Sequence, residues 1–321
     1  MALLKRINPF SRQNNDTGFG TNASSYGGRF INRDGSFNIR REGRSFVDRF
    51  NVYHALLNLP VWQFGLVVLL FFFFINLLYA SVYYCVGYTE LQGMLGKTPW
   101  QKFKEVFFFS TETFTTVGYG RINPIGLGAN IVAAIEAMTG FLSIAVATGL
   151  IYGRFSKPRA HLLFSDEALI TPFHDKSALM FRFASYKEHH TLTNVEVLVT
   201  LGLQVQEEGE AVYQFFDLPL ERRKVETLSM NWTVVHLIDE QSPLLGFNAK
   251  DMEVADVEIY VTVRGFNDVY SNTVLQRTSY TYEEVLFDRR FVPMYRESSD
   301  GKTTVLELHN LSKSEPLEAE D

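Results

Sequence analysis

The chain of 321 residues contains a single cysteine, Cys85, and few of the patterns that mark enzymes. One thiol cannot form a disulfide within the chain, so no such bond braces any loop. The seven histidines show no metal-ligand spacing, and no glycine-rich phosphate loop follows a predicted strand. Serine, histidine and aspartate form no recognisable hydrolase motif. We therefore expect no enzyme activity and no cofactor, and we likewise expect no nucleic-acid partner.

Charge is nearly missing from two long segments. Residues 61–86 are apolar apart from Gln63, Asn76 and small residues, and residues 129–152 are interrupted by Glu136 and a few hydroxyl groups. A helix of about 20 apolar residues crosses the hydrocarbon core of a bilayer. The sequence predicts a membrane protein with two transmembrane helices, at about 61–86 and about 129–155.

The net charge of −6 conceals an uneven distribution along the chain. Residues 1–60 have a balance of +5, residues 61–159 of +3 and residues 160–321 of −14. Basic residues gather before the first span and after the second, whereas the three lysines between the spans are a weaker contrary signal. The positive-inside rule then predicts that both termini are cytoplasmic.

The six residues TTVGYG at 115–120 lie between the two spans. Non-helical backbone is tolerated at membrane depth only where it is buried in protein or lines a watery cavity. Rings of carbonyl oxygens from a TVGYG loop replace the hydration shell of K⁺, and glycine reaches the backbone angles that such a loop needs. One copy offers too few carbonyls to surround an ion, so we expect an oligomer. The alternative is a chance Gly-Tyr-Gly turn in an outer loop.

Two short helices are predicted beside the spans. Thr98 can cap a helix with Pro99 at its first position, running to about residue 113 and presenting the negative end of its dipole beside the TTVGYG loop. This helix is too short to cross the bilayer, which favours a re-entrant pore helix. Over residues 44–59 apolar side chains recur at helical spacing up to Pro60, which indicates an amphipathic helix in the membrane interface. A soluble core helix is the alternative for that segment.

The pattern changes after Pro158 to short runs rich in β-branched residues, separated by turn residues. Such runs at 179–183, 195–201, 232–237 and 257–263 predict a cytoplasmic β-sandwich over residues 158–312. Residues 1–43 form a cytoplasmic N-terminal segment that we expect to be partly disordered, with a turn and a short strand at 34–39. Residues 313–321 form an acidic tail, which we expect to be disordered.

Taken together, the chain resembles the prokaryotic inward-rectifier potassium channels over about residues 33–312. The resemblance rests on the filter segment and on GLIYGRFSKPRA at 149–160, which closes the second span. It also rests on two cytoplasmic stretches, WTVVHLIDEQSPL at 232–244 and RTSYTYEE at 277–284. It implies an α+β homotetramer in the cell inner membrane, with a two-helix pore domain over 60–157 and an immunoglobulin-like cytoplasmic sandwich. It implies passive, potassium-selective conduction with Ba²⁺ as a blocker and K⁺ at the filter as the metal.

The resemblance also assigns the filter and its support. It implies that K⁺ is bound by the filter residues Thr116, Val117, Gly118, Tyr119 and Gly120. In the family a glutamate at the position of Glu112 pairs with an arginine two positions after the last filter glycine. Here Arg121 comes one position earlier and Asn123 follows it, so pairing of Glu112 with Arg121 stays a hypothesis.

The second span carries a stripe at four-residue spacing that faces the pore in the family: Gly140, Ile144, Thr148 and Tyr152. Tyr152 matches the bulky residue at the narrowest cytoplasmic end, where four rings could close the path by dewetting. Its alternative is an ordinary interfacial aromatic anchor. Ile144 stands where strong rectifiers hold an acidic residue, so we expect weak intrinsic rectification. Glu136 either substitutes for that acid in part or makes a helix–helix hydrogen bond behind the filter.

Basic residues at the cytoplasmic interface are expected to bind anionic lipid, with phosphoinositides as the implied class. These are Arg44, Arg49, Arg154, Lys157 and Arg159. The same residues are also explained by the positive-inside rule alone. Two other functions compete with a potassium channel: a tethered receptor whose pore does not conduct, and a sodium or non-selective channel of the same plan.

Overall fold

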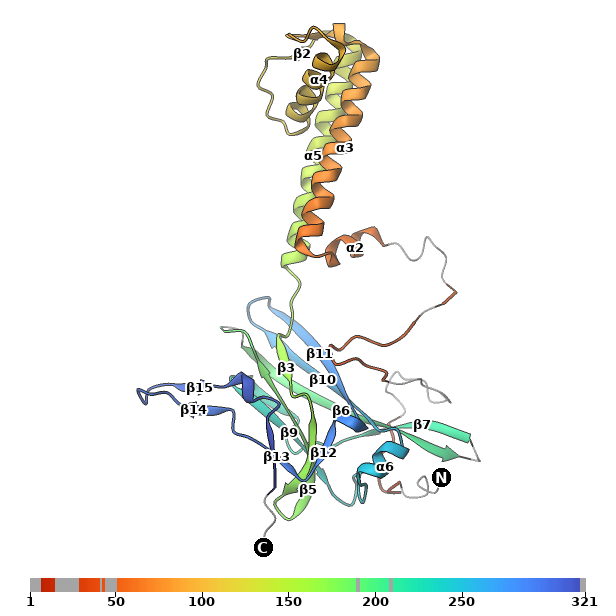
Figure 1. Cartoon of the computed structure of the whole chain (residues 1–321), viewed down its shortest axis with the longest axis vertical. Helices are drawn as coiled ribbons and strands as arrows, with labels where there is room; N and C mark the ends of the chain where they lie inside the picture. The colour runs from red at the N-terminus through yellow and green to blue at the C-terminus, as the bar shows by residue number, and fades with distance from the viewer. Residues whose placement is uncertain are drawn as a thin grey trace. The chain divides into compact units, whose positions relative to one another are not determined.

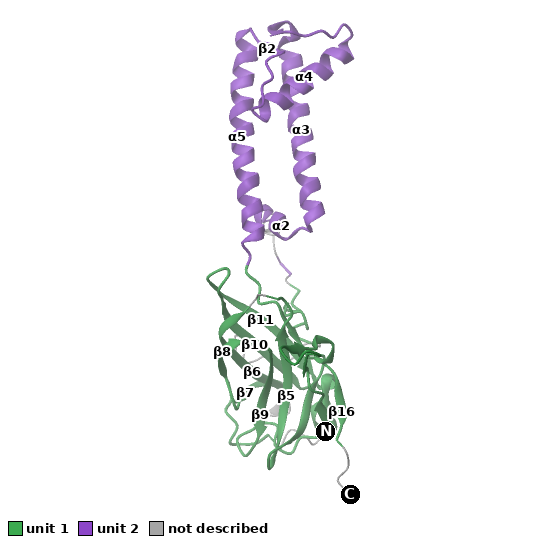
Figure 2. Cartoon of the chain, turned by 90° about the vertical axis from the view of Figure 1, so that its left-hand side faces the viewer, with its two compact units in different colours: residues 1–41, 158–321 green, residues 42–157 purple. Residues whose placement is uncertain are grey.

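The computed structural model describes residues 7–14, 29–40, 42–43, 51–188, 191–207 and 210–317. The chain forms two compact units, one of residues 42–157 and the other of residues 1–41 with 158–321 (Figure 2). The expected helix over 44–59 falls partly outside the described residues, which include α2 (Val52–Asn58).

The unit of residues 42–157 is built on two long apolar helices. In Figure 1, α3 (Val61–Gly87) and α5 (Leu127–Phe155) run alongside each other, and α4 (Pro99–Phe114) packs beside them. Both long helices have the length and composition of membrane spans, and only 11% of the most apolar window of each is buried in the chain. A core helix of a soluble protein would be mostly buried, so these faces are suited to lipid or to neighbouring subunits.

The sequence sets the start of α4 locally. The Thr98 hydroxyl accepts the N–H of Gln101, the Gln101 side chain accepts the N–H of Thr98, and Pro99 occupies the first helical position. This reciprocal pair satisfies two N–H groups that a helix start otherwise leaves unpaired. The helix therefore begins where the Thr98-Pro99 signal predicts.

Glu90 joins the end of the first span to the start of the second. It ends a 3₁₀ turn, η2 (Tyr88–Glu90), and its carboxylate accepts the N–H of Ala129 in the first turn of α5 at 2.8 Å. Its backbone carbonyl accepts the N–H of Ile125, also at 2.8 Å. A carboxylate at a helix N-terminus is favoured by the helix dipole. The short strands β1 (Leu91–Gln92) and β2 (Asn123–Pro124) pair next to this contact.

The unit of residues 1–41 with 158–321 contains two five-stranded sheets. The first has the order β11-β10-β6-β7 with β8 also paired to β6, and the second has the order β12-β4-β5-β3 with β9 paired to β5. The first comprises β6 (Leu192–Glu207), β7 (Glu210–Asp217), β8 (Lys224–Leu228), β10 (Glu258–Asn267) and β11 (Asn272–Thr281). The second comprises β3 (Leu162–Phe164), β4 (Ala168–Phe173), β5 (Lys176–Ser185), β9 (Asn231–Ile238) and β12 (Val285–Phe287). Neighbouring strands are antiparallel except β12 and β4, which are parallel.

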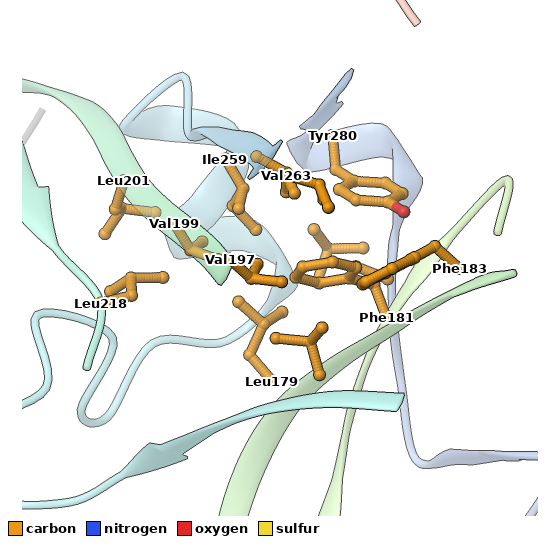
Figure 3. Close-up of a cluster of buried hydrophobic side chains, with 14 of the residues drawn as sticks. Leu179, Phe181, Phe183, Val197, Val199, Leu201, Leu218, Ile259, Val263 and Tyr280 are labelled. Atoms are coloured by element: carbon orange, nitrogen blue, oxygen red, sulfur yellow. The ribbon is translucent and has the colours of Figure 1, made fainter. Parts of the chain in front are cut away.

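Alternate residues of the central strands form one core between the sheets. Figure 3 shows Phe181 and Phe183 of β5 facing Val197 of β6 and Tyr280 of β11, all at most 1% exposed. The period of two places successive side chains on opposite faces, so the alternating runs bury one face each. The predicted β-sandwich is confirmed, and each predicted run lies within or largely overlaps a strand.

Smaller elements complete this unit around the two sheets. They are α6 (Ala249–Val254), η3 (Tyr282–Glu284), β13 (Arg289–Phe291), β14 (Tyr295–Glu297), β15 (Thr304–Leu306), η4 (Leu308–Asn310) and β16 (Ser314–Pro316). At the other end of the chain, the Glu258 carboxylate accepts the N–H groups of Phe30 and Ile31. The short strand expected at 34–39 is reduced to one bridge, Ile31 to Phe37, around the predicted Asp34-Gly35 turn.

The acidic tail differs from its prediction at its start. Residues 314–316 form β16, which pairs with β13, whereas disorder was expected from residue 313. The guanidinium of Arg182, 3% exposed, donates to the carbonyls of Val292, Asn310 and Leu311. It therefore ties the C-terminal segment to β5. Tertiary contacts of this kind override a local composition that favours disorder.

The burial of His236 predicts how the stability of the β-sandwich unit depends on pH. The His236 ring is 3% exposed, with Nδ1 2.6 Å from the Pro219 carbonyl and Nε2 2.8 Å from the Ser242 hydroxyl. A neutral imidazole satisfies both partners by donating from Nδ1 to the carbonyl and accepting at Nε2 from the hydroxyl. Burial lowers the pKa of His236 in the folded state. The unfolded chain, with a histidine pKa of about 6.5, then binds more protons in acid. The free energy of unfolding should fall below about pH 6.5, by at most about 1.4 kcal/mol per pH unit.

Thermal unfolding of the full chain in detergent between pH 7.5 and 5.5 tests this. His236→Gln should show a weaker dependence of Tm on pH than the native chain, because the titrating group is gone. His309→Gln, at an exposed site, is the matched control and should keep the native dependence. Equal pH dependence in the two variants would contradict the role given to His236.

Candidate functional site

The TTVGYG segment has a backbone that alternates in handedness. Thr116 has φ 61°, Gly118 has φ 54° and Gly120 has φ 80°, so every second residue is left-handed. In an ordinary strand successive carbonyls point to opposite sides, whereas this alternation allows them to face one side. The left-handed φ of Thr116 is sterically unfavourable, because the Cβ of a residue other than glycine then lies too close to the following carbonyl oxygen.

The segment is held to the end of α4 by its own backbone. The Glu112 carbonyl accepts the N–H of Val117 at 2.9 Å and of Gly118 at 3.3 Å. At the other end, the Asn123 side chain donates to the Gly120 carbonyl at 2.9 Å. All five residues from Thr116 to Gly120 are exposed in the single chain. A carbonyl-lined path therefore needs further copies of the chain around it.

Arg121 has a different partner from the one hypothesised. Its Nη1 lies 3.1 Å from Oε1 of Glu105, while the Glu112 carboxylate has no hydrogen-bond partner among the described residues of the single chain. Glu105 lies two helical turns before Glu112, about 10 Å nearer the start of α4. Arg121 lies beside that end because the chain returns there after the filter. The pairing of Glu112 with Arg121 is therefore wrong for contacts within one chain.

Glu105 was missed by the sequence reasoning, and it also organises the outer loop. Its Oε2 accepts the N–H groups of Leu95 at 2.9 Å and Gly96 at 3.0 Å. One carboxylate thus joins α4, the loop before it and the residue after the filter. Only its position in the first turns of an expected pore helix could have drawn attention to it.

Gly140 differs from the rest of the expected pore-facing stripe. It is buried, and a Cβ there would overlap the Phe114 carbonyl at the end of α4. Ile144, Thr148 and Tyr152 are exposed in the single chain. Gly140 is therefore a packing residue between α5 and α4, because only a glycine lets the two backbones approach this closely.

The C-terminal end of α5 is hydrogen-bonded to α2 and the residue after it. Arg154 donates to the carbonyls of Leu56 and Leu59, both at 2.7 Å, and its guanidinium lies 4.6 Å from the centre of the Phe64 ring. Lys157 donates to the Asn58 side chain at 2.7 Å. Two of the expected lipid-binding cations thus also satisfy groups at the end of α2. Arg44 and Arg49 lie outside the described residues.

Tyr152 lies in the last turns of α5 with its side chain 73% exposed. One residue later, a Cβ on Gly153 would lie 3.3 Å from Leu57 and 3.4 Å from the Tyr53 hydroxyl, so α2 packs closely there. Gly149 has open space around it.

No group of three or more His, Cys, Asp or Glu in the described part of the chain could hold a metal ion.

Comparisons with known proteins agree with this architecture. The profile of the inward rectifier potassium channel C-terminal domain matches residues 162–320, and that of the ion channel family matches residues 66–157. Inward rectifier potassium channel Kirbac3.1 of Paramagnetospirillum magnetotacticum is 33% identical over 277 residues, which cover 85% of this chain and 92% of the relative. Inward rectifier potassium channel 18 of Homo sapiens is 26% identical over 312 residues, covering 88% and 70% of the two chains.

These relatives are ion channels rather than enzymes, and channels of this family are tetramers. The fold class predicted from the sequence, a two-helix pore domain followed by a cytoplasmic β-sandwich, is confirmed. The chain belongs to the prokaryotic inward-rectifier potassium channel family.

Proposed function

We propose that four copies of this chain form a potassium-selective pore through the carbonyls and the Thr116 hydroxyl of residues 116–120. The alternating handedness at Thr116, Gly118 and Gly120 is the observation that carries this proposal, because it lets successive carbonyls face one axis. The C-terminal end of α4 lies beside the same segment and adds the negative end of its dipole. We also propose that the protein lies in the cell inner membrane with both termini in the cytoplasm, as the positive-inside rule predicts.

Uptake of ⁸⁶Rb⁺ into liposomes containing the purified full chain tests the proposal. We expect uptake that Ba²⁺ blocks and that K⁺ competes with strongly, whereas Na⁺ competes weakly. No Ba²⁺-sensitive uptake would favour the non-conducting receptor. Equal competition by Na⁺ and K⁺ would favour a non-selective channel.

Tyr152 is proposed as the gate at the cytoplasmic end of α5. Its exposure in the single chain leaves the ring available to meet its three symmetry mates, which would close a narrow path by dewetting. Tyr152→Ala should raise the open probability of single channels by about tenfold, the effect of removing a barrier of about 1.4 kcal/mol. Phe155→Ala, one turn further and equally exposed, is the control. An unchanged open probability in Tyr152→Ala tetramers would leave the ring as an interfacial anchor.

Rectification is proposed to be weak. Ile144 places no charge on the exposed face of α5, and Glu136 is fully buried, so neither attracts intracellular polyamines or Mg²⁺ electrostatically. Outward and inward currents in symmetrical K⁺ with added spermine measure this, and strong block of the outward current would contradict it.

Regulation by anionic lipid is proposed at the junction of α2 and α5. Arg154 and Lys157 already bond to α2 there, so a lipid phosphate would compete for the same donors. From the sequence, Arg44, Arg49 and Arg159 are also predicted to bind lipid, and Arg44 and Arg49 lie outside the described residues. Flux with and without phosphoinositide on a triple variant that neutralises Arg154, Lys157 and Arg159 checks the proposal. A native response in that variant would exclude these three residues.

A further inference from the structure

Four polar side chains are buried where α3, α4 and α5 cross. Asn76, Ser110 and Glu136 are 0% exposed and Tyr83 is 1% exposed. Apolar packing alone specifies little in a membrane, because lipid is as apolar as the side chains it replaces. A polar cluster shared by three helices is therefore a candidate for fixing how they are placed.

Glu136 is the centre of this cluster. The Tyr83 hydroxyl of α3 donates to its Oε2 at 2.7 Å, and the Ser110 hydroxyl of α4 donates to its Oε1. The Ser110 oxygen also lies 3.1 Å from Oδ1 of Asn76, whose amide donates to the Phe72 carbonyl at 2.7 Å. One carboxylate of α5 thus accepts from both other helices, and every buried side-chain polar atom among the described residues has a partner.

The position of the cluster relates it to the filter. Ser110 lies four residues before Phe114, and Glu136 lies four residues before Gly140, so both pairs are one helical turn apart. Gly140 packs on the Phe114 carbonyl, immediately before the TTVGYG segment. The Ser110–Glu136 bond and the Phe114–Gly140 contact are therefore successive contacts of α4 on α5, and together they fix the depth and rotation of α4.

We propose that Glu136 is a positioning residue for ion selectivity, which holds the pore helix through Ser110 so that the filter carbonyls keep the spacing that K⁺ requires. This rests on the proposed function of the filter and adds the group that sets its geometry from behind. The carboxylate acts through α4 and does not touch the ion, because it is buried between helices of its own chain.

Five single substitutions test the proposal in full-length tetramers. Ser110→Ala removes the bond to α4, Tyr83→Phe removes the bond to α3, and Glu136→Ala removes both. Glu136→Gln conserves the shape of the side chain. Its amide oxygen can accept from one of the two hydroxyls, and its NH₂ group can donate to the other. Tyr79→Phe is the matched control, because the Tyr79 hydroxyl hydrogen-bonds to the Thr139 hydroxyl at 2.8 Å and so links α3 to α5 rather than to α4.

Two readouts are taken on each variant: competition of Na⁺ and K⁺ with ⁸⁶Rb⁺ uptake, and amide hydrogen exchange over residues 107–118. Ser110→Ala and Glu136→Ala should lower the preference for K⁺ over Na⁺ about tenfold, as expected for the loss of one buried hydrogen bond. They should also speed exchange at the end of α4. Tyr83→Phe should have a smaller effect, Glu136→Gln should lie close to the native chain, and Tyr79→Phe should match it.

The outcomes separate this proposal from the function on which it rests. Native selectivity and native exchange in Ser110→Ala would overturn the positioning role while leaving the channel assignment in place. Equal losses in Tyr79→Phe would also overturn it, since any α3–α5 bond would then suffice. A native chain without Ba²⁺-sensitive uptake would refute the proposed function. Hydrogen exchange in Ser110→Ala compared with Tyr79→Phe would then still decide whether Glu136 positions α4.

Discussion

Gly118→Ala should abolish Ba²⁺-sensitive ⁸⁶Rb⁺ uptake, with a fall of at least a hundredfold. Gly118 has φ 54°, where a side chain costs about 1–2 kcal/mol per residue. Four subunits repeat that cost around a single ion path, which gives about 4–8 kcal/mol per channel. The segment can relieve the strain only by rotating its peptides, which turns a carbonyl away from the ion.

The control for this experiment imposes the same backbone cost elsewhere. Gly246 of the cytoplasmic unit has φ 78° and nothing within 4 Å of a built Cβ, as is also true of Gly118. Gly246→Ala should lower stability by a similar amount per chain and leave ion selectivity intact. If Gly118→Ala tetramers kept native uptake, the carbonyls of residues 116–120 would not be the conducting surface.

Gly140→Ala should have the second largest effect. The added methyl group would overlap the Phe114 carbonyl, which is backbone and has no flexible end to move aside. Overpacking of a tight site costs about 1–3 kcal/mol, and each of four subunits bears it. We expect loss of most of the Ba²⁺-sensitive uptake and a reduced yield of tetramer by size-exclusion chromatography.

Gly149 provides a matched substitution on the same helix. A Cβ there meets nothing within 4 Å, so Gly149→Ala removes only the flexibility of glycine and should stabilise α5 by about 0.5–1 kcal/mol. Native flux in Gly140→Ala would contradict the packing role and would support the original prediction that Gly140 faces the pore. Loss of flux in Gly149→Ala but not in Gly140→Ala would instead identify a bending point.

The features that could be predicted from the sequence depend on residues that lie close together along the chain. The start of α4 follows from Thr98, Pro99 and Gln101 because capping involves groups within four residues. The strands of the sandwich follow from alternation along β5, β6, β9 and β10, and the long helices from their composition. The TTVGYG motif could predict a filter because the proposed ion-binding groups are the backbone carbonyls of consecutive residues.

The features that the sequence could not supply depend on which distant residues meet. The sequence did not reveal that Arg121 pairs with Glu105 rather than with Glu112, because the partner depends on the path of the chain after the filter. Gly140 belongs to the same spacing as Ile144, yet it faces α4 since α5 crosses that helix at this turn. The start of the tail, which was expected to be disordered, forms the strand β16 because it pairs with β13 and because Arg289 of β13, 25 residues earlier, donates to the Ser314 carbonyl.

Glu136 shows the division most clearly. The sequence by itself determined that a carboxylate lies within an apolar span and left open whether it faces the pore or another helix. Only the tertiary structure decided that two hydroxyls, from Tyr83 and Ser110, donate to it. Local sequence patterns determine whether a segment forms a helix or a strand, through its backbone preferences and the spacing of its apolar residues. Which distant side chains come into contact depends on how the helices rotate and cross. Local sequence patterns do not contain that information for residues that are tens of positions apart.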